Sequence, residues 1–278
     1  IMNGASAWCG VRVLVLFICY LGVAMTFGGC SQPKGVVFQP LEDPLSWPHP
    51  PATSRISYVG SLYTDKDLKP GKSFTDSLSE SLFGEEPSYS MLTPYAVCTD
   101  EKNRVFVCDS NAQLVHVFDL ETREYMRWKP DVQGVSFSQP VGVAFDSLDR
   151  LLVSDSAAGI IFAFDQHGNY LGSLGDGELD RPTGLAVDRA NNRIFVADVG
   201  THQIVVLSFD GELIDRIGYR GVELGEFNYP TNVVLGRDGS LYVSDSLNFR
   251  VQVFDQEFNL YGRLVLKGIC RDISHTLR

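Results

Sequence analysis

Basic residues never gather in this sequence. Its 278 residues include 23 Lys and Arg against 34 Asp and Glu, which gives a formal net charge of −11. Proteins that bind nucleic acid draw their affinity from clustered Lys and Arg on phosphate groups. We therefore expect no nucleic-acid partner, and the acidic balance mainly favours solubility.

Catalytic constellations are missing too. The sequence has no Ser-His-Asp arrangement, no Cys-His pair and no phosphate-binding glycine loop that leads into a helix. The histidines are scattered singly, at His49, His116, His167, His202 and His275. Zinc needs three or four convergent ligands. No catalytic residue, cofactor site or metal site is therefore predicted.

Cysteines are too few for a disulfide framework. Of the six, three lie within the first 30 residues, which leaves an odd number: Cys98, Cys108 and Cys270. Cys98 and Cys108 are expected on neighbouring strands of one hairpin, with Cys98 opposite Val105 and Cys108 opposite Tyr95. In that register they are too far apart for a bridge, which needs Cα atoms within about 7 Å.

The N-terminus differs from the rest of the chain. Arg12 is the only charged residue before Cys30, residues 13–24 are almost purely apolar, and two glycines lead into Cys30. A basic start, an apolar core and small residues before a cleavage point are typical of an export signal. We assign this signal to residues 1–29.

The end of this signal resembles the lipobox of bacterial lipoproteins, with Phe27 where Leu is usual. The resemblance implies that Cys30 becomes the lipidated first residue of the mature protein, and Ser31 after it implies the outer membrane of a Gram-negative cell. Two alternatives stay open. One is an uncleaved anchor helix, since residues 13–29 are nearly long enough to span a bilayer; the other is an ordinary cleaved signal. All three place the remaining chain outside the cytoplasm, on the periplasmic or extracellular face.

Two further segments precede the repeats. Residues 30–55 hold six prolines within 19 residues, which favours an extended tether. Residues 56–90 are predicted to contain a first strand and an irregular insertion with a short helix. Ser73 can cap that helix, apolar residues recur at i, i+4 and i+8 from Phe74, and Gly84 can end it.

From residue 91 the chain repeats itself. Each unit has a Pro-led apolar strand, a polar turn, a second strand that ends in Asp, and two more strands. The leading prolines are spaced by 46, 42 and 48 residues. This period, with four short strands, is typical of a β-propeller blade. We predict an all-β propeller over 91–278 with an aberrant C-terminal tail and four antiparallel blades, innermost strand first: 93–130, 139–175, 181–218 and 229–264.

The repeats resemble NHL repeats. The resemblance is carried by RPTGLAVD at 181–188, VADVGTH at 196–202 and LYVSDSLNFRVQVFD at 241–255. It implies a propeller that usually closes with six blades. Some NHL and related propellers are metal-dependent lyases or lactonases, with the metal held by the innermost strands. The corresponding strands contain no His, Asp or Glu here: 95–99, 141–145, 183–187 and 231–235.

Four aspartates stand at equivalent positions in successive units: Asp109, Asp155, Asp198 and Asp245. Each is followed by a turn, and an Asp side chain fixes such a turn by accepting backbone N–H bonds. A catalytic acid is needed once, not once per blade. We therefore assign these four residues a structural role in the turns.

The repeat array is expected to be incomplete. Residues 58–62 (YVGSL) mimic the fourth strand at 170–174 (YLGSL), as if they completed a last blade that is not present. Beyond residue 265 the pattern is abandoned. We expect about two more repeats in the functional protein, no contact between blades one and four, and exposed blade faces that invite aggregation.

Two functions fit these observations. The first is a membrane-tethered, extracytoplasmic scaffold that binds a protein or an extracellular ligand. The second is a lactonase-like or lyase-like enzyme whose site residues lie in blades outside this sequence. The fold narrows the choice little, because one fold hosts many functions.

Overall fold

The computed structural model describes residues 35–39, 41–42, 45–48, 52–69, 71, 78, 81–84 and 87–265. The chain divides into two compact units, residues 1–39 with 69–86 and residues 40–68 with 87–278. In the first unit, Leu78 and residues 81–83 are helical, within the predicted short helix. The export signal, Cys30 and Cys270 lie outside the described residues. Among the described residues no helix has the length and apolar character needed to cross a membrane.

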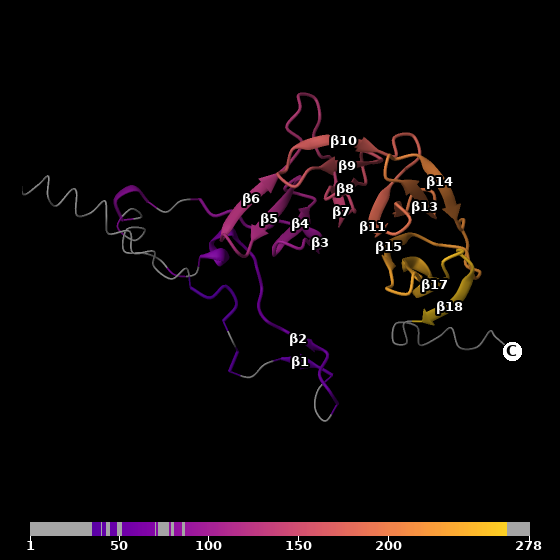
Figure 1. Ribbon diagram of the computed structural model, residues 1–278, viewed down its shortest axis with the longest axis horizontal. Coiled ribbons are helices and arrows are strands. Elements are labelled where there is room, and N and C mark those ends of the chain that lie inside the picture. The colour runs from indigo at the N-terminus through magenta and orange to yellow at the C-terminus, as the bar shows by residue number, and fades with distance from the viewer. Residues whose placement is uncertain are drawn as a thin grey trace, which may run out of the picture. The chain divides into compact units, whose positions relative to one another are not determined.

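The second unit contains four four-stranded antiparallel sheets, which are the predicted blades (Figure 1). Blade 1 consists of β3 (Pro94–Thr99), β4 (Arg104–Asp109), β5 (Leu114–Asp119) and β6 (Glu124–Trp128). Blade 2 consists of β7 (Pro140–Phe145), β8 (Leu151–Asp155), β9 (Ile160–Phe164) and β10 (Tyr170–Leu174). Blade 3 consists of β11 (Pro182–Asp188), β12 (Arg193–Asp198), β13 (Gln203–Ser208) and β14 (Leu213–Ile217). Blade 4 consists of β15 (Pro230–Leu235), β16 (Leu241–Asp245), β17 (Arg250–Phe254) and β18 (Leu260–Val265).

The prediction of an all-β propeller with four such blades is confirmed. The Pro-led strands are innermost: β3 lies beside β7, β7 beside β11, and β11 beside β15. Proline suits the first residue of a strand because it has no N–H to give to a ladder. After each of these prolines the pairing slips by a bulge before the ladder continues. Contact on this scale does not join β3 to β15, so blades 1 and 4 do not meet through their inner strands.

The hydrophobic core lies between successive blades rather than within any one of them. Three buried clusters fill the spaces between blades 1 and 2, blades 2 and 3, and blades 3 and 4. Phe106, Phe162 and Phe195 are among the largest side chains there and are fully or almost fully buried. Each blade therefore depends on its neighbours, as expected for a repeat protein.

The predicted register of the first hairpin is wrong by one residue. Cys98 pairs with Phe106 and Cys108 with Ala96. The turn has three residues rather than two, because Asn103 adopts a left-handed conformation with φ of 58°, as in hairpins closed by a type I turn and a bulge. Both thiols are free, Cys108 is buried and Cys98 half-buried.

The first strand expected after residue 56 is also much shorter than predicted. It is β2 (Ile56–Ser57), which pairs with β1 (Ser46–Trp47) inside the proline-rich tether. Residues 58–62 belong to no strand. A fourth strand needs the edge of a third strand to pair with, and no sheet among the described residues offers that edge to 58–62.

Candidate functional site

One end of every blade carries the loops that distinguish this molecule, and we call it the connector face. It comprises the connectors between blades (129–139, 175–181 and 218–229), the segment before β3 (87–93), and the turns between second and third strands (110–113, 156–159, 199–202 and 246–249). These loops share one end because the start of each inner strand pairs with the end of the second strand, as Pro140 does with Asp155.

Asp155 shows how a buried carboxylate holds two of these loops together. It accepts hydrogen bonds from the backbone N–H groups of Ser138 and Gln139 in the connector, at 2.6 and 2.9 Å. It also accepts from Ala157 and Ala158 in the following turn, at 3.2 and 3.0 Å. Four N–H groups from two segments therefore converge on one side chain, and the loops are fixed relative to each other.

The other repeated aspartates occupy the same position and are all fully buried. Asp109 and Asp198 each bind the segment before the inner strand and the turn after the second strand. Burial alone would raise the pKa of Asp109, but the N–H groups of Ala112, Leu92 and Thr93 outweigh it and leave this pKa below its usual value. The carboxylate is thus ionised at neutral pH and serves as an acceptor.

Blade 4 uses side chains for the same task. Asp245 accepts from the backbone of Asn228 and from the side chains of Asn248, Arg250 and Gln252. Arg250 is buried and donates to the carbonyl oxygens of Val222, Glu223 and Glu226 at 2.6–2.9 Å. One guanidinium group therefore shapes the whole connector 218–229, with its charge balanced by Asp245.

Exposed apolar side chains gather on this connector face. Its large exposed hydrophobic residues are Leu92, Val132, Tyr219, Val222, Leu224, Tyr229, Leu247 and Phe249. At the opposite end of the blades, in the loops 100–103, 146–150, 189–192, 236–240, 120–123, 165–169, 209–212 and 255–259, Leu148 is the only described residue of that kind. Apolar surface gathered on one face indicates an interaction site.

The aromatic residues at the last connector divide between packing and display. Phe227 is fully buried and contacts Phe254. Tyr229 is partly exposed, and its backbone N–H donates to Nδ1 of the buried His202. Tyr219 is largely exposed. The sequence favoured packing for this group, and that holds fully for Phe227 alone.

Charge on the connector face is mainly acidic. Its acidic residues within the three connectors are Asp131, Asp176, Glu178, Asp180, Glu223 and Glu226, and its basic residues there are Lys129, Arg181 and Arg220. A surface with this balance repels phosphate. The face suits an apolar protein surface with basic residues around it.

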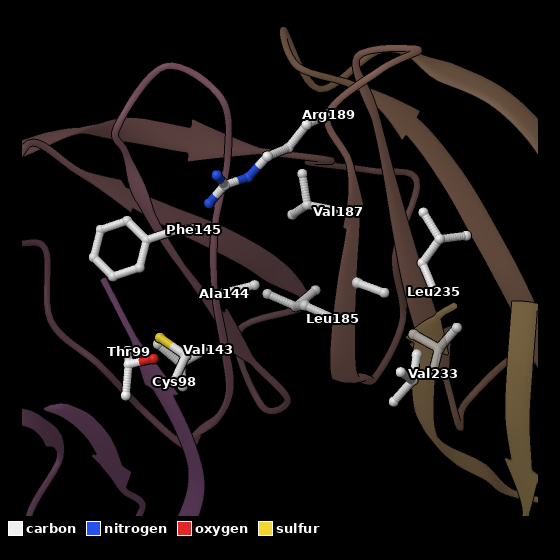
Figure 2. Close-up of a pocket in the computed structure, with 12 residues that line it drawn as sticks. Cys98, Thr99, Val143, Ala144, Phe145, Leu185, Val187, Arg189, Val233 and Leu235 are labelled. Atoms are coloured by element: carbon white, nitrogen blue, oxygen red, sulfur yellow. The ribbon is translucent and has the colours of Figure 1, made fainter. Parts of the chain in front are cut away.

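The inner strands enclose a second feature, an open hollow of about 280 Å³ (Figure 2). Its lining is mostly aliphatic and comes from all four inner strands. Arg189 reaches toward the side lined by Phe145. Burial, with a smaller contribution from Asp100, raises the pKa of the Cys98 thiol to about 12, so this thiol is not a nucleophile at neutral pH. The hollow offers no acid–base pair, and the described residues bring no three His, Cys, Asp or Glu together as metal ligands.

A buried polar network in blade 1 escaped the sequence reasoning. His116 lies on β5, with Nδ1 2.7 Å from the Tyr125 hydroxyl and Nε2 3.2 Å from Asp109. Burial lowers the pKa of His116, against the opposing effect of Asp109. A signal was present: seven residues after the repeated Asp, the four blades carry His116, Phe162, Val205 and Gln252. Only the polar members of this set contact the Asp.

Comparison with known proteins agrees with this fold. The NHL repeat family model matches residues 179–207 and 227–254. The chain contains NHL repeats. Over 130 residues it is 30% identical to Protein brain tumor of Drosophila melanogaster, an alignment that takes in 45% of this chain and 12% of that protein.

Solved structures extend the likeness to enzymes. A virginiamycin B lyase of Staphylococcus aureus matches with a TM-score of 0.51 and 15% identity, over 63% of this chain and 56% of that chain. A gluconolactonase of Xanthomonas campestris matches with a TM-score of 0.53 and 19% identity, over 63% of this chain and 62% of that chain. The NHL-repeat chain spans less than two thirds of each of these proteins, and identities this low establish the propeller fold alone.

Proposed function

We propose that this protein is a scaffold that binds a protein partner through its connector face. The observation that carries the proposal is the concentration of exposed apolar side chains on that face, above loops fixed by buried aspartates. Rigid loops lose little conformational entropy on binding, and aromatic and aliphatic side chains supply the contact area.

Binding can be tested by mutating the most protruding loop. We expect the double variant Val222→Ser, Leu224→Ser to lose a partner that the wild-type chain captures by photo-crosslinking from its native membrane fraction. The matched control is Leu148→Ser, an equally exposed apolar residue at the opposite end. Equal capture by the double variant and the wild type would contradict the proposal.

The second part of the proposal concerns location. The export signal over 1–29 supports an exported protein that is lipidated at Cys30 and held at the outer membrane or cell surface by the tether 30–55. A lipidated cysteine with several acyl chains anchors stably, whereas one chain is marginal. Cys30→Ser should release the protein from the detergent-soluble membrane fraction. An unchanged molecular mass after inhibition of signal peptidase II would contradict lipidation.

An enzyme of the lyase or lactonase kind is the alternative, because proteins of both activities share this fold. The hollow between the inner strands has no ionisable lining residue except Arg189 and the inert thiol of Cys98. Catalysis would therefore need residues outside the described part of the chain. Stoichiometric zinc in the purified protein, together with lactone hydrolysis, would favour this alternative over the scaffold.

A further inference from the structure

Each blade has two different faces, which we name by the order of the chain. The receiving face packs against the preceding blade, and the giving face packs against the following blade. Blades 2 and 3 bury both faces. The receiving face of blade 1 and the giving face of blade 4 have no neighbouring blade among the described residues.

The receiving face of blade 1 is built like the others. At the position two residues before the repeated Asp, blade 1 has Val107 where blades 2, 3 and 4 have Val153, Val196 and Val243. Near the end of the third strand it has Phe118, in register with Phe164, Leu207 and Phe254. By these residues, blade 1 is suited to a preceding blade.

A segment of the same unit covers this face, and we call it the cap: residues 62–68 and 87–92. Its 3₁₀ helix η1 (Asp65–Leu68) places Leu68, 1% exposed, in a cluster with Val107 and Phe118. Leu62 and Met91 pack against the same cluster. The cap thus fills the space that a preceding blade would occupy over β4, β5 and β6.

The two parts of the cap are tied to each other by a few polar contacts. Asp65 accepts from the Ser88 hydroxyl and from the backbone of Tyr89, at 3.1 and 2.7 Å. Asp67 accepts from the backbone N–H groups of Tyr63 and Thr64, at 2.6 and 2.8 Å. These carboxylates hold the 3₁₀ turn in shape, and neither carries a residue of the apolar cluster.

The giving face of blade 4 is uncovered. Val234, 60% exposed, occupies the position of Cys98, Ala144 and Ala186, which point toward the next blade in blades 1 to 3. Tyr242 is half-buried, whereas its counterparts Phe106, Leu152 and Phe195 are fully buried. Leu264 and Tyr261 are exposed on the outer strand β18.

We infer that the giving face of blade 4 binds the receiving face of blade 1 in a second copy of this chain, and that the cap blocks this contact until it is displaced. The occupant follows from chemistry, because every giving face here packs on a receiving face and blade 1 has the one receiving face not already held by a blade among the described residues. Two such contacts between two copies close a two-fold ring of eight blades, within the known range of propellers.

The test uses the full chain, purified in detergent, with mass measured by light scattering across a concentration series. The cap is opened by Asp65→Ala with Asp67→Ala, which leaves the apolar cluster unchanged. A second opened variant is Leu68→Asp. The matched control is Leu82→Asp, an exposed leucine outside the cap. We expect the wild type and the control to remain monomeric and both opened variants to double in mass.

Adding Val234→Arg on blade 4 to the opened variants should return them to monomers. Hydrogen exchange of β4–β6 reports whether the cap has opened, independently of assembly. Opened variants that expose β4–β6 and yet stay monomeric would overturn the inference. So would assembly that survives Val234→Arg, since that is non-specific aggregation, and so would a wild type that is already dimeric through blade 4.

Discussion

The receiving face of blade 1 and the giving face of blade 4 are both ends of the same repeat array, yet one is covered and the other open. Phe118 is fully buried under the cap, whereas Val234 is 60% exposed. Both are apolar residues at positions that successive blades use for packing. The difference shows that a repeat's own sequence fixes which side chains point outward, while burial depends on what lies beside the blade.

The two end blades differ from the middle ones in a second way. Seven residues after the repeated Asp, blades 2 and 3 carry Phe162 and Val205, whereas blade 1 carries His116 and blade 4 carries Gln252. In both end blades this polar side chain reaches the Asp. The middle blades spend that position on apolar packing, and their aspartates rely on backbone N–H groups instead.

The largest expected effect compares the covered and the open face directly. Phe118→Ala should lower the free energy of unfolding by about 3–5 kcal/mol, because it removes a buried ring and leaves a cavity. Val234→Ala should change it by no more than about 0.5 kcal/mol, because the side chain is mostly in water. Urea unfolding at neutral pH measures both. Similar losses would mean that the two faces are equally covered in solution.

A smaller effect is expected from the carboxylate that joins the cap to blade 1. Asp109→Asn keeps one acceptor oxygen but loses the other, which accepts from Leu92 and His116. We expect a loss of about 1.5–3 kcal/mol, the range for hydrogen bonds to charged groups. Hydrogen exchange should quicken at the Leu92 amide. Asp119→Asn, in an exposed turn of the same blade, is the control; an equal loss there would remove the special role of Asp109.

Most of the propeller was predictable because its signals are local and repeated. The Pro-led strand and the terminal Asp recur in four units, and each marks a strand boundary that the structure keeps. The one-residue error at Cys98 arose from the turn before Arg104, where the left-handed Asn103 adds a residue to the loop. Asn tolerates that conformation, but the sequence alone does not show that it is adopted.

The cap was beyond sequence reasoning for a different reason. Residues 62–68 and 87–92 are separated in the chain and meet through a single bridge, Thr64 with Ser90. Leu68 has no periodic partners, so its burial depends wholly on the tertiary position of β5 and β6. The resemblance of 58–62 to a fourth strand was equally uninformative, because a strand forms only where a neighbouring edge accepts it.

The smallest expected effect is a change in pH dependence from the polar residue of blade 1. Burial holds the pKa of folded His116 below its ordinary 6.5. The unfolded chain therefore binds more protons just below that pH, and stability falls as the pH is lowered from about 7 to 5. Asp109, whose folded pKa is also lowered, loses its contribution only near pH 4 and below. The window between pH 5 and 7 thus separates the two groups.

His116→Gln places in blade 1 the residue that blade 4 has at Gln252, with no titration in this window. We expect a loss of about 1 kcal/mol at pH 7, the scale of one hydrogen bond, and a flatter dependence of unfolding free energy on pH between 5 and 7. His167→Gln, in an exposed turn of blade 2, should keep the wild-type slope. Urea unfolding at pH 5, 6 and 7 measures all three proteins. An unchanged slope in His116→Gln would show that the imidazole is not held neutral by burial, and would leave the two end blades differing in their covering alone.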